Sequence, residues 1–286
     1  MAWVGLVLIY GLLKGGREIV KKKSLEKSSV MEVLFFYTLF SFLLVLPDAK
    51  NAMGLTPVQY GYVALKSFII FLAWILSFKA IKKMPISLYG ILDLSRVLFA
   101  TLLGTIVLKE TLGTNQIIGL ILVASGLLLL KFKGGRKRGQ KKEGAEASAI
   151  VVIFALGSCM LNAVSGLMDK ILMKQMNSSQ LQFFYMLFLV LYYLIYIICS
   201  KEKLHIANSL KNYWIWLLAI MFVVADRSLF LANAMAESKV TVMTLIKQSG
   251  CLVTILGGKF VFHEKNIGYK LLCAGVIVAG IVVAVL

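Results

Sequence analysis

Residues 133–147 read KGGRKRGQKKEGAEA, a polar, basic and glycine-rich segment near the middle of a chain of 286 residues. Five strongly apolar stretches precede this segment and five follow it. They lie at 2–14, 31–47, 59–79, 86–108, 115–132, 148–169, 181–199, 212–234, 239–262 and 267–286. Most have the ~17–25 residues that an α-helix needs to cross a bilayer, and they lack the alternation of β-barrel strands. We therefore predict an all-α integral membrane protein with ten transmembrane helices, in which 133–147 links two groups of five.

The composition also favours a membrane location. Apolar residues make up 60% of the chain, charged residues make up 15%, and the mean hydropathy is +0.88. Soluble domains have about 45–50% apolar and about 25% charged residues. The net charge of +18 would suggest nucleic acid as the partner of a soluble protein, but most basic residues here lie between apolar stretches. We interpret them as topology signals and as contacts with membrane lipids, with no nucleic-acid partner.

An internal repeat relates the two groups of stretches. A shift of 154 positions places Ala80 on Ala234, Gly104 on Gly258, Glu110 on Glu264 and Gly126 on Gly280. Earlier in each group, FFYTLF at 35–40 corresponds to FFYMLF at 183–188 with a shift of 148. Two matches in the same order indicate a duplicated unit with connections of different length.

Because five is an odd number of spans, two such units joined in series must lie in the membrane with opposite orientations. The first connection of the first unit carries Arg17, Lys21, Lys22, Lys23 and Lys27, whereas its counterpart carries Lys170 and Lys174. The second connection shows the reverse, with Lys50 alone against Lys201, Lys203 and Lys211. The basic side therefore changes between units, as inversion requires. We predict a first five-helix repeat at 1–132, a basic cytoplasmic linker at 133–147, a second repeat at 148–286, and outward-facing termini in the plasma membrane.

These residues resemble those of EamA-type members of the drug/metabolite transporter superfamily. The pattern is an alanine-containing helix end, a helix that closes in Glu, and a final helix with spaced glycines. It is SFKAIKKMPISLYG at 77–90 with LLGTIVLKETLGTNQIIGLILVASG at 102–126, and again LANAMAESKVTVMT at 231–244 with ILGGKFVFHEKNIGYKLLCAGVIVAG at 255–280. The resemblance implies a secondary transporter of small metabolites, with a central cavity between the halves and alternating access.

Ionisable groups in the middle of the stretches are the candidate substrate ligands, because such groups cost too much to face lipid. Tyr89, Asp93 and Arg96 are spaced i, i+4 and i+7 on the helix expected at 86–108. The repeat places Lys247 opposite Asp93, with Gln248 beside it. These residues either line a substrate cavity or form an Asp93–Lys247 or Asp93–Arg96 ion pair that holds the halves together.

Other polar residues have equally open roles. Asn162 lies near the middle of its stretch, where it serves either helix packing or solute contact. Asp226 and Arg227 are adjacent, so only one of them can face a cavity squarely. Lys66 either lines the cavity or extends to the membrane surface, as we also expect for Lys14 and Arg17.

The remaining charged and small residues have expected structural roles. Asp169 is expected near the surface, bound to Lys170 or Lys174. Glu110 and Glu264 end the fourth helix of each unit, and we expect each to bind the N-terminus of the helix that follows. The repeated glycines should allow close helix packing.

The balance of buried charge suggests the class of solute. Lys66, Arg96, Arg227 and Lys247 outnumber Asp93 and Asp226, which favours an anionic or zwitterionic solute. Asp93 or Asp226 could also bind a coupling proton.

Rival functional classes lack their sequence signatures. Neither GxSxG nor HExxH occurs, and the chain has two histidines and no CxxC pair. We therefore predict no enzyme activity, no metal site and no cofactor. A flippase for a lipid-linked sugar, or an exporter of lipophilic compounds, remains the alternative. Opposed charges inside inverted repeats suit a carrier better than a channel, and no oligomer is required.

Overall fold

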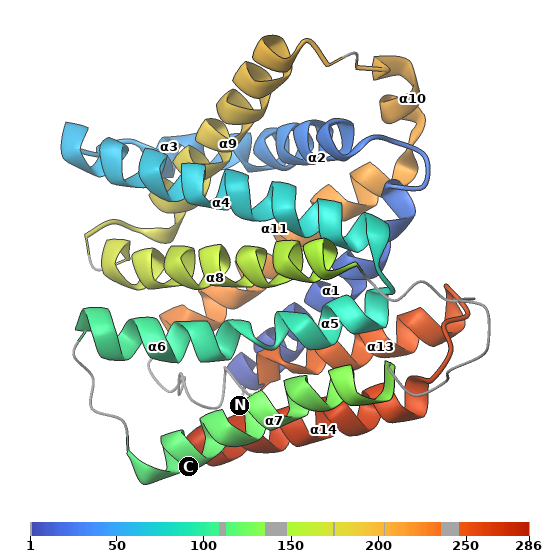
Figure 1. The fold of residues 1–286 in the computed structure, drawn as a ribbon. Helices are drawn as coiled ribbons and strands as arrows, with labels where there is room; N and C mark the ends of the chain where they lie inside the picture. The colour runs from blue at the N-terminus through green and yellow to red at the C-terminus, as the bar shows by residue number, and fades with distance from the viewer. Residues whose placement is uncertain are drawn as a thin grey trace.

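The computed structural model describes residues 2–108, 113–134, 148–173, 175–202, 204–235 and 246–285. Within these ranges the chain is helical and contains no β-strand. The elements are α1 (Ala2–Ser24), α2 (Val30–Val45), the 3₁₀-helix η1 (Leu46–Asp48), α3 (Ala49–Ala52), α4 (Pro57–Lys83), α5 (Ile86–Asp93), α6 (Arg96–Leu108), α7 (Thr114–Gly134), α8 (Ala149–Leu172), α9 (Ser178–Ser200), α10 (Ile206–Lys211), α11 (Tyr213–Ala234), α13 (Ser249–Phe260) and α14 (Ile267–Val285) (Figure 1). The predicted linker, apart from its first two residues, lies outside the described part.

Several helices are long and apolar enough to cross a membrane. Five candidate spans cover Val30–Ala52, Pro57–Lys83, Ile86–Leu103, Ala149–Asp169 and Ser178–Ser200, and shorter apolar helices include Ser249–Phe260. Large apolar side chains face outward, such as Ile106 and Ile198, which are 74% and 66% exposed. An exposed apolar surface of this kind requires lipid as its solvent. The prediction of an all-α membrane protein is confirmed.

Matching capping boxes start α2 and α9. Ser29 accepts a hydrogen bond from the backbone N–H of Glu32, whose carboxylate accepts from the N–H of Ser29. Asn177 and Gln180 make the same reciprocal pair at the start of α9, at the shift of 148 that relates the two aromatic segments. Each pair satisfies two backbone donors that a helix N-terminus leaves open. The repeat therefore extends to the local signal that begins the helix.

The stretch 86–108 is not the single helix that its apolar run predicts. Helix α5 ends at Asp93 and α6 begins at Arg96, and the backbone between them forms i→i+3 hydrogen bonds, from Ser95 N–H to Leu92 O for example. This local tightening breaks the helix without a proline. In the other repeat, α13 begins at Ser249 after a turn at Gln248, which corresponds to Leu94 at the shift of 154. Both repeats are thus interrupted at the same position.

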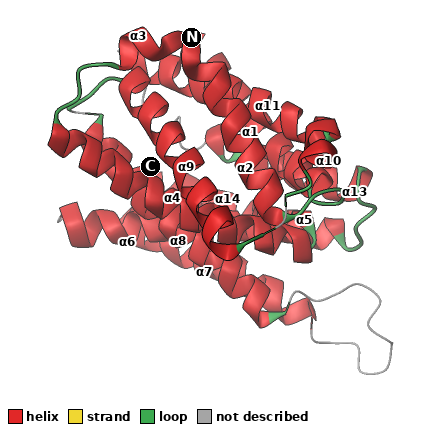
Figure 2. Ribbon diagram, turned by 90° about the horizontal axis from the view of Figure 1, so that it is seen from above, coloured by secondary structure: helices red, strands yellow, loops and turns green. Residues whose placement is uncertain are grey.

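The first helix of each half packs against the opposite half. Helix α1 contacts α11 and α13, whereas α8 contacts α4, α5 and α6. The contacts of α2 with α9 and of α7 with α14 join equivalent helices of the two halves, and α5 contacts α13, the equivalent of α6 (Figures 1 and 2). The expected packing role of glycine is confirmed between α7 and α14, where a Cβ on Gly280 would lie 2.8 Å from the carbonyl oxygen of Gly119. Helices of the two halves are therefore interlocked.

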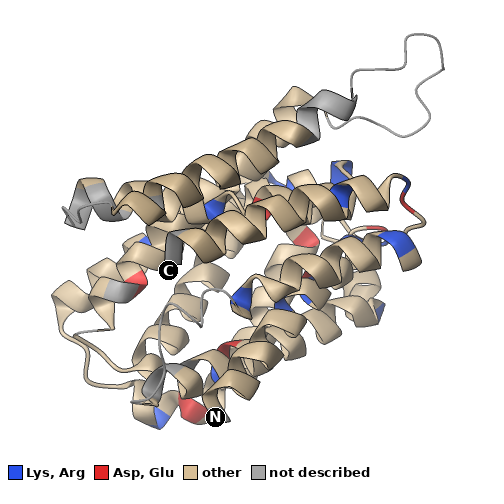
Figure 3. Ribbon diagram, turned by 90° about the horizontal axis from the view of Figure 1, so that it is seen from below, with Lys and Arg blue, Asp and Glu red and all other residues tan. Residues whose placement is uncertain are grey.

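Polar contacts tie the connections together at each end of the bundle. At one end, here called the α10 end, the His205 N–H donates to Glu32 and the Asn212 amide donates to Ser28. At the other, called the α3 end, the Asn177 amide donates to the carbonyl of Asn51 and the Gln180 amide donates to that of Met53. Charged residues lie at both ends and also along the middle of the helices (Figure 3).

Candidate functional site

The break between α5 and α6 places two oppositely charged groups of the same segment in contact. Asp93, at the C-terminal end of α5, binds Arg96 with an Oδ1–Nη2 distance of 2.7 Å. Its other oxygen lies 3.0 Å from Nζ of Lys14 on α1. A carboxylate at a helix C-terminus is unfavourable unless cations compensate it, and here two cations do so. Of the two ion pairs weighed from the sequence, the structure forms Asp93–Arg96, with Lys14 in addition.

Lys14 and Arg17 lie inside the protein, so the expectation that they extend to the membrane surface is wrong. Helix α1 continues without interruption through Gly15 and Gly16, which places both cations mid-helix rather than at its end. Arg17 is 8% exposed, and its guanidinium lies 3.8 Å from Asp226 and 5.1 Å from the ring centre of Phe222. The pair joins α1 to α11.

The sequence of α1 contains a pattern that indicates these buried charges. Lys14, Glu18 and Lys21 follow one another at i, i+4 and i+7, so they share one face of the helix. Lys21 binds Glu18 at 2.7 Å. Alternating charges at helical spacing that directly continue an apolar run indicate a buried polar face, whereas Lys14 and Arg17 considered singly suggested only side chains that extend to the membrane surface.

Lys247 is partly buried and has no carboxylate partner within the described part of the chain: no acidic oxygen there lies within 4.0 Å of its ammonium group. The ammonium group lies 5.9 Å from the ring centre of Tyr10. The neighbouring Gln248 lines the cavity described next.

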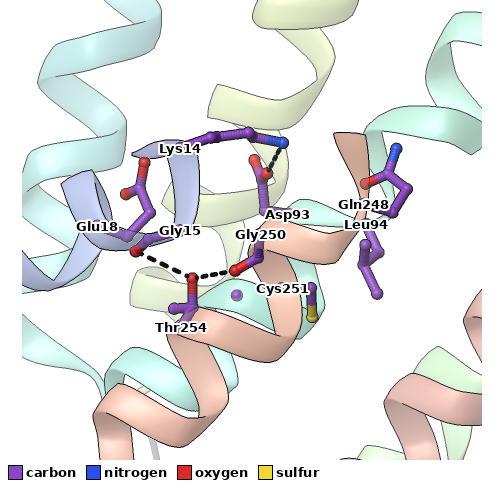
Figure 4. A pocket seen from close by; sticks show the side chains of 10 residues that line it. Lys14, Gly15, Glu18, Asp93, Leu94, Gln248, Gly250, Cys251 and Thr254 are labelled. Carbon is purple, nitrogen blue, oxygen red and sulfur yellow. Dashed lines mark hydrogen bonds and ion pairs between the residues drawn. The ribbon is translucent and has the colours of Figure 1, made fainter. Parts of the chain in front are cut away.

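A small cavity lies where α1, α5 and α13 meet. Its wall includes Lys14, Glu18, Asp93, Gln248, Gly250 and Thr254. Figure 4 shows the Lys14–Asp93 ion pair on one side, and the Thr254 hydroxyl between the carbonyl oxygens of Gly15 and Gly250, at 3.4 and 2.9 Å. The volume of about 10 Å³ suffices for about one water molecule. Charged side chains thus lie beside apolar ones in this wall, and the cavity is too small for a metabolite in this conformation.

The remaining candidate residues lie apart from this cavity. The Tyr89 hydroxyl bonds to Ser77 at 2.7 Å, and the Asn162 amide donates to the Ser158 carbonyl of its own helix at 2.8 Å. Both contacts favour packing roles in this conformation.

Two further ion pairs involve predicted cations. Lys66 binds Asp169 at 3.1 Å, and Arg227 binds Asp48 at 2.5 Å. Asp169 was expected to bind Lys170 or Lys174, whose side chains lie outside the described part of the structure. Because Lys66 and Arg227 each have a carboxylate, they do not provide the uncompensated charge. Lys14, Arg17, Lys21, Arg96 and Lys247 still outnumber Glu18, Asp93 and Asp226 among the described residues around the centre.

Glu264 binds a different helix from the one predicted. Instead of the following α14, it caps α5 in the other half: the backbone N–H groups of Ile86 and Ser87 donate to its oxygens at 2.5 and 3.2 Å. Burial alone would raise the pKa of Glu264, but the Ser87 hydroxyl, Lys270 and these N–H groups together hold the pKa below its ordinary value. Its repeat partner Glu110 lies outside the described residues.

Comparisons with known proteins agree with this architecture. The model of the EamA-like transporter family matches residues 1–132 and 149–286. One solved crystal structure superposes on 97% of this chain and 98% of its own, with a TM-score of 0.61 and 13% sequence identity. At that identity the likeness concerns the fold alone. No curated protein matches the chain.

Proposed function

Because the chain belongs to the EamA-like transporter family, we propose that it is a secondary transporter that moves a small anionic or zwitterionic metabolite across the cell membrane by alternating access. In this proposal 1–132 and 148–286 are inverted repeats, and the solute binds between them. The protein needs no cofactor and catalyses no covalent step.

The observation that carries the proposal is a cation at the matched helix breaks, Lys247, that has no carboxylate partner among the described residues. Lys247 immediately precedes one break and Arg96 immediately follows the other. A buried cation without a counter-charge is costly, so an anionic solute group would compensate Lys247. The N-terminal ends of α6 and α13 lie at the same breaks, and their partial positive charge favours an anion there as well.

The small size of the central cavity supports the part of the proposal that concerns alternating access. A space for about one water molecule cannot hold a metabolite, so binding requires the halves to move apart. A carrier passes through such a closed state between its outward-open and inward-open conformations.

Uptake into liposomes tests the proposal directly. Purified protein is reconstituted, and uptake is measured for labelled organic acids, sugar phosphates, charged amino acids and the lipophilic cation tetraphenylphosphonium. We expect saturable uptake of one anionic or zwitterionic class. Preference for tetraphenylphosphonium, or dependence on a lipid-linked sugar, would contradict the proposal.

The substitution Lys247→Met tests the site. Loss of a charge-assisted contact with the solute should raise KM about tenfold to a hundredfold. Lys259→Met is the matched control, because Lys259 lies on the exposed side of the same segment. Equal effects of the two substitutions would remove Lys247 from the binding site.

A further inference from the structure

Helix α5 is held at both of its ends by other elements. The helix has eight residues, from Ile86 to Asp93. Its C-terminal end is bound through Asp93 to Lys14 of α1, and its N-terminal end is bound by Glu264 from the connection between α13 and α14. A short rigid helix thus connects the central charges to the α10 end of the bundle.

Glu264 gathers several charged contacts at this end. Besides the two N–H groups of α5, it accepts a hydrogen bond from the hydroxyl of Ser87, and Lys270 of α14 lies 3.2 Å away. Lys22 of α1 approaches to 3.6 Å and also donates to the carbonyl of Met84 at 2.7 Å. One carboxylate, only 9% exposed, therefore joins α1, α5 and α14.

The elements that meet at Glu264 also enclose the central cavity. Helix α1 contributes Lys14 to the cavity and Lys22 to the Glu264 contacts, while α5 contributes Asp93 to the cavity and Ile86 to those contacts. At about 1.5 Å per helical residue, these pairs of positions are about 11–12 Å apart. Separation of α1, α5 and α13 at the α10 end would open the shortest route to the cavity along these helices.

The contact surface between these three elements, here called the seam, is suited to open. A Cβ on Gly90 would lie 2.9 Å from Thr254, and one on Gly258 would lie 3.1 Å from Ser87, so at these two points α5 and α13 meet through small groups, beside the buried apolar pair Ile91 and Ile255. The Glu18 carboxylate lines the cavity, and one of its buried oxygens has no hydrogen-bond partner among the described residues. Parting the seam would expose polar groups to water, which is favourable for a solute path.

We propose that the seam between α1, α5 and α13 is the path from the central cavity to the α10 end, and that Glu264 is the latch that closes it. The identity of the path rests on the proposed transport function, because only a carrier has a solute to pass. The opening itself is a property of the protein that can be measured without any solute.

A native cysteine reports on the opening. Cys251 lines the cavity and is 7% exposed. The other three cysteines are first replaced, by Cys159→Ala, Cys199→Ser and Cys273→Ala. The rate at which Cys251 is then labelled by the membrane-impermeant anion 2-sulfonatoethyl methanethiosulfonate is measured in sealed vesicles of both orientations. We expect Glu264→Gln to raise this rate at least about tenfold, and only with reagent on the side of the α10 end. Ser87→Ala should produce a smaller change of the same sign, and Glu264→Asp should restore slow labelling.

Glu26→Gln is the matched control, because Glu26 is a half-exposed carboxylate at the same end that binds Lys23 at 3.2 Å. An unchanged rate in Glu264→Gln would overturn the latch, as would equal acceleration from both sides, which indicates general loosening. If Glu264→Gln does not yield a monodisperse protein, an unchanged rate in Ser87→Ala overturns the proposal. A protein that labels as expected but transports no tested solute keeps the latch and loses the carrier function. Solute transport with unchanged labelling refutes the latch alone.

Discussion

At the scale of single residues, the contacts of Asp93 determine how much stability is lost when each of its charged partners, or Asp93 itself, is replaced. Asp93→Asn leaves both Lys14 and Arg96 without their carboxylate, whereas Lys14→Met leaves Asp93 bound to Arg96. We expect Asp93→Asn to destabilise the protein by about 3 kcal/mol or more, because it strands buried positive charge. Lys14→Met should cost about 1.5 kcal/mol, the value of one charge-assisted contact.

Thermal unfolding of the purified variants in detergent measures these effects. The double variant with Asp93→Asn and Lys14→Met should be more stable than Asp93→Asn alone, because removal of Lys14 eliminates one of the two cations left without a carboxylate. Strictly additive losses would show that the two side chains do not interact.

At the scale of elements, the crossing of α1 and α13 depends on glycine. A Cβ on Gly15 would overlap the carbonyl oxygen of Gly250 and lie 2.9 Å from its Cα, and these backbone atoms cannot move aside alone. Gly15→Ala should therefore destabilise the protein by about 1–3 kcal/mol through overpacking. Gly5→Ala is the control on the same helix, since a Cβ there meets nothing within 4 Å. Its melting temperature should be unchanged or slightly higher, and equal losses in the two variants would contradict the close crossing.

The sequence predicted the elements better than their interruptions. Long apolar runs indicate helices directly, because they reflect local energetics. The breaks after Asp93 and at Gln248 have no proline to mark them. They depend on partners distant in the sequence, such as Lys14, and apolar content alone carries no information about them.

At the scale of the whole molecule, the distribution of basic residues predicts which end of the helix bundle faces the cytoplasm. The connections at the α10 end include Lys22, Lys27, Lys82 and Lys211, and a basic end is retained in the cytoplasm. A protease site inserted in 133–147 should therefore be cut in inside-out vesicles, whereas an N-terminal tag should be digested in intact cells. Cleavage of both from the same side would contradict the inverted arrangement.

The interlocking of the halves could not be predicted from the repeat. The shift of 154 positions identifies equivalent residues, but it does not say whether α1 packs on its own half or on the other. The same uncertainty affected the site. Asp93, Arg96 and Lys247 were found by their cost in a membrane, while Lys14 and Arg17 were missed because their burial depends on α11 and α13.

The placement of α1 against the opposite half has a consequence for biosynthesis. The ribosome delivers α1 long before α11 and α13 exist, although these helices provide its buried surroundings. Until then, Arg17 lacks Asp226 and α1 can contact mainly α4 and α5 among the described helices of its own half, so stable entry of its charged residues into the hydrocarbon is unfavourable. The nascent N-terminal helix must therefore be held back until the last helices emerge, and a chain truncated before them would leave its first segment without a place in the bilayer.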